Sequence, residues 1–155
     1  MAGLFDPLQL GAFEISNRIV MAPLTRARAG RDAVPNELMA AYYAQRSTAG
    51  LITSEATGIS REGLGWPGAP GLWNDAQVEG WKRVTEAVHN HGGRIVAQLW
   101  HMGRLVHPNV SGMEPVSSSA TTAPDYAHTW EGKVPYVEAR AATRHDIGRI
   151  VGDYT

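Results

Sequence analysis

The segment GGRIVAQLWHMGR, residues 92–104, carries the clearest pattern for predicting the fold. An apolar run follows its two glycines and leads to a glutamine, a tryptophan and a histidine. Strand alternation predicts one face with Val96, Gln98 and Trp100 and another with Ile95, Ala97 and Leu99. Because apolar side chains occur on both faces, we expect a strand covered on both sides, as in a parallel sheet. Near its C-terminal end, Gln98 is either a hydrogen-bonded core amide or a group that binds a planar polar ligand.

The composition is that of a globular chain without a strong electrostatic preference. Its 155 residues fit one domain, and 43% hydrophobic with 19% charged residues excludes a disordered or membrane-spanning chain. A net charge of -1 gives no basis for nucleic acid or an anionic membrane as a partner. The absence of cysteine excludes disulfides, thiolate catalysis and cysteine-bound metals. The opening MAGLFDPLQL lacks the segments typical of export, so we expect a cytoplasmic protein.

The elements before this strand alternate between strands and helices. A hairpin is expected at residues 8–15 around Gly11, a buried strand at 18–22 and another strand at 51–57. Asn36 is the expected cap of a helix that runs to about Ala49, with Gly50 ending it in the left-handed conformation. Asn74 and Gln77 match a capping box for a second helix. The predicted apolar stripe of that helix is Val78, Trp81, Val84 or Thr85, and Val88. This order is typical of parallel βαβ units.

Residues 101–142 depart from that order. They contain four prolines and a serine run without a helical stripe, which predicts a long lid or binding loop, or a disordered segment. A helical pattern returns from Thr143 to Thr155, with Thr143 as the expected cap. Three βα units are too few for an eight-stranded barrel of about 250 residues, and three parallel strands alone leave two apolar edges unpaired. We therefore expect these residues to be the first part of a larger α/β protein.

The predicted strand ends bring together groups suited to a flat ligand. The three strands end near Thr25, Ala56 and Gln98, and parallel strands place such ends side by side. Hydroxyl, amide, indole and apolar groups there are typical of a site for a heteroaromatic molecule. The alternative is that these positions are polar only because loops begin there.

Two other patterns are not interpreted as sites. Residues 63–68 match the G-x-G-x-x-G dinucleotide fingerprint, but prolines interrupt them and no helix follows directly, so a loop is expected. His101 and His107 have no ligand spacing or nearby acidic partners, and no metal is expected there.

Five segments together resemble the N-terminal part of the old yellow enzyme family: SNRIVMAPLTR, YYAQRSTAGLITSEAT, GWPGAPGLWND, GWKRVTEAVHNHGGRIVAQLWHMGR and HDIGRIVGDY. These are FMN-dependent ene-reductases built on a TIM barrel. The resemblance covers nearly the whole chain, and residues 105–140 contribute least. It implies that residues 1–155 are the N-terminal part of a single FMN-binding α/β TIM (β/α)8 barrel, supplying the hairpin and about the first three βα units.

The resemblance also implies roles for particular side chains. The positions that would contact FMN are Pro23, Leu24, Thr25, Ala56 and Gln98. The Thr25 hydroxyl would hydrogen-bond the flavin C4 carbonyl and tune the reduction potential, Ala56 would pack against the ring edge, and Gln98 would bond its pyrimidine part. Trp66 and Trp100 would shape the substrate pocket.

The expected activity is NAD(P)H-dependent reduction of activated C=C bonds in α,β-unsaturated carbonyl or nitro compounds, such as enones. The family's carbonyl-binding His/Asn pair and its tyrosine proton donor would lie beyond Thr155, so no catalytic residue is expected in this segment. Activity would then require the C-terminal half of the barrel, possibly as a separate chain. Two alternatives are a non-catalytic half-barrel that binds flavin or self-associates, and another flavin-dependent TIM-barrel enzyme, such as a relative of dienoyl-CoA reductase.

Overall fold

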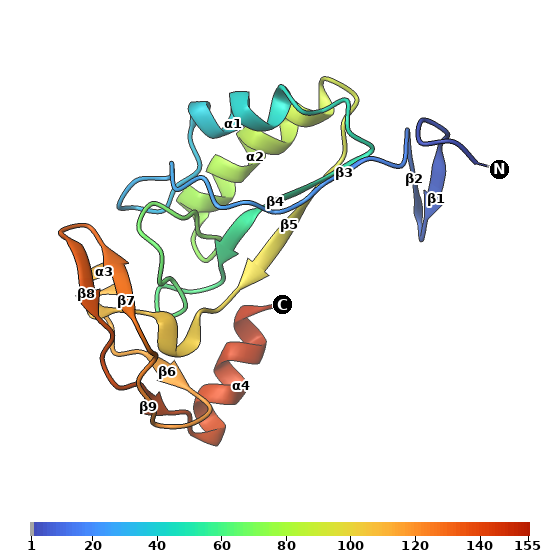
Figure 1. Cartoon of the computed structure of the whole chain (residues 1–155). Coiled ribbons are helices and arrows are strands. Elements are labelled where there is room, and N and C mark those ends of the chain that lie inside the picture. The colour runs from blue at the N-terminus through green and yellow to red at the C-terminus, as the bar shows by residue number, and fades with distance from the viewer. Residues whose placement is uncertain (1) are drawn as a thin grey trace.

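The computed structural model describes residues 2–155, and its central feature is a three-stranded parallel sheet in the order β3–β4–β5. The strands are β3 (Val20–Met21), β4 (Leu51–Gly58) and β5 (Ile95–Trp100). Helices α1 (Glu37–Ala44) and α2 (Asp75–His89) connect them and lie together over the same face of the sheet (Figure 1). This arrangement confirms the predicted βαβ units.

The core lies between the two helices and the sheet. Met39 and Tyr43 of α1 pack with Ile52 of β4 and with Trp81 and Val84 of α2, and all five are at most 8% exposed. Each such side chain contributes about 1.5–3 kcal/mol through burial. The helix caps were correctly predicted, because both Asn36 and Asn74 accept a backbone N–H three residues ahead.

Several local predictions about the helices are wrong. Helix α1 ends at Ala44, and Gly50 does not adopt the left-handed conformation. A side chain at Gly50 would instead place its Cβ 2.0 Å from the Asn17 carbonyl oxygen, and this contact accounts for the glycine. Asn74 and Gln77 form only half of a capping box, since Gln77 accepts the Trp73 N–H. Val78 lies outside the buried stripe of α2.

The expectations that β5 is covered on both sides and that β3 is buried are also wrong for residues 2–155. Within residues 2–155, both are edge strands that pair only with β4. Val20 of β3 is 53% exposed, and Val96 of β5 is 40% exposed. β4, which has a neighbour on each side, is buried along nearly its whole length. Burial therefore follows the number of neighbouring strands that these residues provide.

The N-terminal hairpin lies apart from this sheet, toward the N-terminal ends of its strands (Figure 1). It consists of β1 (Leu8–Leu10) and β2 (Phe13–Ile15), which pair antiparallel around Gly11 at φ +58°, as predicted.

Residues 101–142 form a subdomain of short helices and strands at the opposite end, which is inconsistent with the disordered alternative (Figure 1). That these residues are a lid or binding loop stays a prediction. The elements of this subdomain are η1 (Gly103–Leu105), α3 (Pro108–Ser111), β6 (Val116–Ser117), β7 (Tyr126–Thr129), β8 (Gly132–Pro135) and β9 (Arg140–Ala141). Helix α4 (Arg144–Asp153) follows, with Thr143 and Asp146 forming a capping box. The elements within residues 101–142 are two to four residues long, and such short segments carry too little periodicity to be predicted from sequence.

Candidate functional site

The ends of the three parallel strands form the candidate site. The segment with Pro23, Leu24 and Thr25 leaves the end of β3, and Ala56 pairs with Gln98 across β4 and β5. Trp100 ends β5, and Trp66 lies in the connection between β4 and α2. The structure thus places the residues predicted from sequence at one end of the sheet, on three neighbouring strands and the loop after β4.

A bulge in β4 sets the geometry of this end. Thr53 pairs with Val96, but the next pair is Ala56 with Gln98, so Ser54 and Glu55 together face one residue of β5. The Ser54 hydroxyl accepts the Gln98 N–H at 3.2 Å, which satisfies a donor beside the irregular pairing. Bulges commonly occur beside active sites, where they redirect a side chain.

The redirected side chain is that of Glu55, which is 1% exposed. Its Oε2 accepts the backbone N–H groups of Arg26 at 2.9 Å and Ala27 at 3.2 Å. The Tyr43 hydroxyl donates to Oε1 at 3.2 Å and accepts the Glu55 N–H at 2.7 Å. Burial raises the pKa of the Glu55 carboxyl, while its hydrogen bonds with Arg26, Ala27 and Tyr43 act to lower it. Sequence reasoning missed this role, although an acid inside an apolar strand signals a buried partner.

The polar groups proposed to contact a ligand remain available. Within residues 2–155, neither the Thr25 hydroxyl nor the Gln98 side-chain amide forms a hydrogen bond, although both residues lie at the sheet end. Leu24 is 57% exposed, and Ala56 is buried and so presents only a small surface. A hydroxyl and an amide on either side of a small apolar residue fit a planar ring whose edge carries hydrogen-bonding groups.

Tryptophans surround this end of the sheet. Trp66, Trp73 and Trp100 pack against one small apolar cluster of Ala33, Leu64 and Ala69. The centroids of the Trp66 ring and of the His128 ring in β7 are 4.8 Å apart, so the subdomain helps to fix the position of Trp66. The indole N–H of Trp100 is buried without a hydrogen-bond partner in the described part of the chain.

The glycines at 63, 65 and 68 have packing roles, consistent with their interpretation as a loop. A Cβ at Gly63 would lie 2.7 Å from the His101 ring, and one at Gly65 would lie 2.7 Å from the Leu105 carbonyl oxygen. Gly68 has φ +73° and its own close contact with Ala27. These glycines let the β4–α2 connection approach its neighbours closely.

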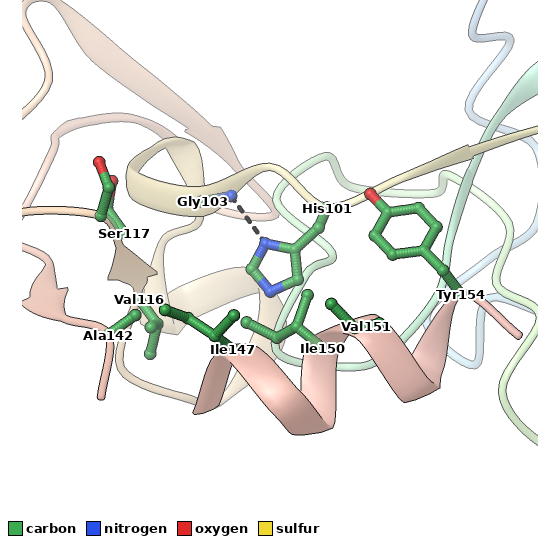
Figure 2. Close-up of a pocket in the computed structure, with 10 residues that line it drawn as sticks. His101, Gly103, Val116, Ser117, Ala142, Ile147, Ile150, Val151 and Tyr154 are labelled. Atoms are coloured by element: carbon green, nitrogen blue, oxygen red, sulfur yellow. Dashed lines mark hydrogen bonds between the residues drawn. The ribbon is translucent and has the colours of Figure 1, made fainter. Parts of the chain in front are cut away.

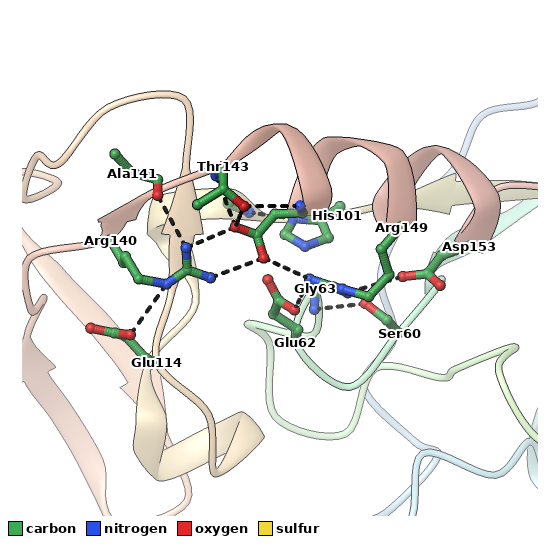
Figure 3. A network of polar contacts seen from close by, with 12 residues as sticks. Ser60, Glu62, Gly63, His101, Glu114, Arg140, Ala141, Thr143, Arg149 and Asp153 are labelled. Atoms are coloured by element: carbon green, nitrogen blue, oxygen red, sulfur yellow. Dashed lines mark hydrogen bonds and ion pairs between the residues drawn. The ribbon is translucent and has the colours of Figure 1, made fainter.

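A second polar region links α4 to the β4–α2 connection (Figure 3). Arg149 donates to the buried Glu62 at 2.5 Å and lies near Asp146 and Asp153. Asp146 in turn accepts from Arg140 at 2.8 Å, and this bond, with those from Thr143, holds the Asp146 pKa well below its usual range. No periodic pattern indicated this network, because its members come from separate segments.

His101 lies beside that network rather than at the strand-end site. Its Nδ1 accepts the Gly103 N–H at 3.1 Å, and burial lowers its pKa. Figure 2 shows its ring directed toward α4, in a cavity of about 400 Å³ lined largely by apolar side chains such as Ile147 and Ile150.

No three His, Asp or Glu side chains of residues 2–155 are grouped so as to hold a metal ion. None of the helices described is both long and apolar enough to cross a bilayer.

Known proteins share both the sequence and the fold. A solved structure of the old yellow enzyme homologue from Zymomonas mobilis is 63% identical, with a TM-score of 0.96 over 99% of this chain and 43% of that chain. Morphinone reductase in complex with tetrahydroNAD is 48% identical, with a TM-score of 0.92 over 99% of this chain and 44% of that chain. A flavin oxidoreductase of Emericella nidulans is 44% identical over 97% of this chain and 40% of its own length.

This chain therefore spans about two-fifths of the length of the curated relatives that it matches. It corresponds to the N-terminal part of their TIM barrels, which confirms the predicted fold class. Residues 3–155 match the family described as NADH:flavin oxidoreductase / NADH oxidase. The chain belongs to this family, the old yellow enzyme family of flavin oxidoreductases.

Proposed function

We propose that this chain supplies the flavin-binding N-terminal part of an FMN-dependent NAD(P)H oxidoreductase that reduces activated C=C bonds. One observation carries the proposal: two consecutive residues of β4 connect the predicted flavin contacts. Glu55 binds the backbone directly after Thr25, and Ala56 pairs with Gln98. Polar groups from β3 and β5 are thereby held at one edge of the sheet, as an isoalloxazine ring requires.

Each residue has a distinct part in the proposed site. Thr25 and Gln98 would hydrogen-bond the polar edge of the ring, while Pro23, Leu24 and Ala56 would contact it through apolar surface. Trp66 and Trp100 would line the pocket that holds an α,β-unsaturated carbonyl or nitro substrate. Bound FMN supplies the transfer of hydride from NAD(P)H to the alkene, and the protein orients the reactants and excludes water.

The carbonyl clamp and the proton donor would come from the C-terminal part of the barrel, on the same or another polypeptide. The surface that such a partner would cover is apolar. Ile147 and Val151 of α4 are 54% and 60% exposed, and Val20 and Val96 lie on the open strands. Exposed apolar side chains along open strands and one helix face are typical of surfaces that a partner covers.

Complementation tests the proposal. The chain would be combined with FMN and with the C-terminal part of the Zymomonas mobilis homologue, and NADPH-dependent reduction of cyclohexenone would be followed. We expect turnover only when both parts are present, and a large loss of turnover with Gln98→Ala. Absence of turnover, under conditions in which the intact homologue works, would contradict the proposed activity.

The same open surfaces favour a second function, a non-catalytic half-barrel that binds flavin or self-associates. Both functions predict FMN binding by the unmodified chain or its assembly. A flavin spectrum together with a stable homo-oligomer, and no alkene reduction after complementation, would identify the half-barrel instead of the enzyme.

A further inference from the structure

We propose that Glu55 is a positioning residue, which holds the loop after β3 so that the Thr25 hydroxyl is presented to the flavin. This inference rests on the proposed function and assigns a role to a side chain that would not itself contact the cofactor. It explains why a carboxylate is buried inside a strand that has no other charged residue.

Glu55 binds the loop that leaves β3 through two backbone hydrogen bonds. Both Arg26 and Ala27 direct their N–H groups to the same oxygen of Glu55, at 2.9 and 3.2 Å. Hydrogen bonds from backbone amides to a carboxylate are shorter and about twice as strong as those between neutral groups. Thr25 directly precedes this pair, and its hydroxyl forms no hydrogen bond within residues 2–155. Its orientation therefore depends on the backbone that Glu55 holds.

Tyr43 holds Glu55 in place from the opposite side. The Tyr43 hydroxyl binds both its second carboxylate oxygen and its backbone N–H, at 3.2 and 2.7 Å. Tyr43 is 0% exposed and packed in the core between α1 and α2. The carboxylate is thus fixed from the helix layer on one side and binds the loop on the other.

The loop held by Glu55 has a strained backbone at Ala27. Ala27 has φ +55°, a left-handed conformation that residues with a Cβ rarely adopt. Such a conformation persists only where surrounding contacts impose it, and it is commonly found at functional sites. Two contacts impose it here: the bond from its N–H to Glu55, and the Gly68 segment, which accepts the Ala29 N–H at 2.9 Å. Without Glu55, we expect the loop to relax and Thr25 to turn away.

The experiment compares substitutions of two buried glutamates in the full chain. Glu55→Met removes both acceptors, whereas Glu55→Gln keeps one oxygen for the loop and remains available if the methionine variant does not fold. Glu62→Met and Glu62→Gln are matched controls, because Glu62 is also buried but binds Arg149 of α4. The measurements are FMN affinity by fluorescence and hydrogen exchange of residues 24–29 without flavin.

We expect Glu55→Met to weaken FMN binding about tenfold and to speed exchange at Arg26 and Ala27 by a similar factor. Glu55→Gln should lie between this variant and the unchanged chain, and the Glu62 variants should stay within about twofold in both measurements. In a Thr25→Ala background, Glu55→Met should change FMN affinity by less than about twofold, because the group that Glu55 positions is gone.

The outcomes separate the inference from the proposed function. Failure of the unchanged chain to bind FMN overturns the proposed function and the role of Glu55 toward flavin. FMN binding with equal effects of the Glu55 and Glu62 variants overturns the inference alone. An undiminished effect of Glu55→Met in the Thr25→Ala background also overturns it, because Glu55 would then act on general stability.

Discussion

Glu55 at the strand ends and Glu62 beside α4 are both buried, yet they satisfy their charges differently. Glu55 forms no ion pair in the described chain, and both its oxygens accept from backbone amides or a phenol. Glu62 binds Arg149 through one oxygen, while the other has no partner within residues 2–155. The first arrangement fixes the path of a loop at the candidate site, and the second attaches a helix to the sheet connection.

The largest expected effect comes from Arg149→Met. Glu62 is buried and Arg149 only partly so, and removing Arg149 leaves the buried carboxylate uncompensated. We therefore expect a loss of about 3 kcal/mol in the free energy of unfolding. Urea denaturation measures it. Arg144→Met is the matched control, since Arg144 belongs to the same helix and forms no ion pair within residues 2–155. A similar loss in both variants would show that the Glu62 pair has no special role.

Tyr43→Phe should have the next largest effect. It removes the hydroxyl that accepts the Glu55 N–H and donates to its carboxylate, leaving buried groups unsatisfied at a cost of about 2 kcal/mol. Tyr42→Phe is the control. The Arg46 guanidinium lies over the face of the Tyr42 ring, and the Tyr42 hydroxyl forms no hydrogen bond in the described chain. Thermal unfolding of the two variants gives the comparison, and equal melting temperatures would contradict the role of Tyr43.

The two regions should also respond oppositely to pH. The pKa of Glu55 is raised, so the stability it contributes falls as pH rises from the ordinary glutamate value of about 4.3 through its raised folded value. The pKa of Asp146 is lowered, so its contribution is complete above the ordinary aspartate value of about 3.9 and is lost as pH falls.

Unfolding midpoints measured from about pH 3 to about pH 8 test this difference. Glu55→Gln should remove a decline on the alkaline side, and Asp146→Asn should remove a loss on the acid side. Identical pH profiles for the two variants would contradict the assignment of opposite shifts.

The smallest effect is expected for Glu114→Gln. Glu114 pairs with Arg140 at 3.5 Å, but its side chain is 65% exposed, and exposed pairs contribute little because solvent screens them. The urea midpoint should not change measurably. A clear loss would mean that charge, rather than burial, determines the stability of the α4 region.

Sequence patterns predicted the elements whose signals are local. The caps Asn36, Asn74 and Thr143 each bind a backbone N–H of their own helix, so short-range spacing was sufficient to identify them. The order of β3, β4 and β5 followed from the alternation of strands and helices. The predicted burial of Val20 and Val96 failed because it depends on neighbours that residues 2–155 do not provide.

The hydrogen bonds of Glu55 that hold the candidate site could not be predicted from sequence, because they also depend on contacts between distant segments. Thr25 and Gln98 could be placed at strand ends, but the bulge at Ser54 and Glu55 depends on the register between two strands. The hydrogen bonds from Arg26 and Tyr43 to Glu55 join segments 29 and 12 residues apart. The glutamate inside LITSEATG is a local signal of a buried partner, but the sequence does not identify that partner.

Amide NMR of the isotopically labelled chain, titrated with FMN, shows whether flavin binds at the strand ends. We expect the signals of Thr25, Ala56 and Gln98 to shift together with one affinity, while those of α4 remain in place. Shifts confined to α4 and its cavity, or an absence of shifts at all three strand ends, would contradict it.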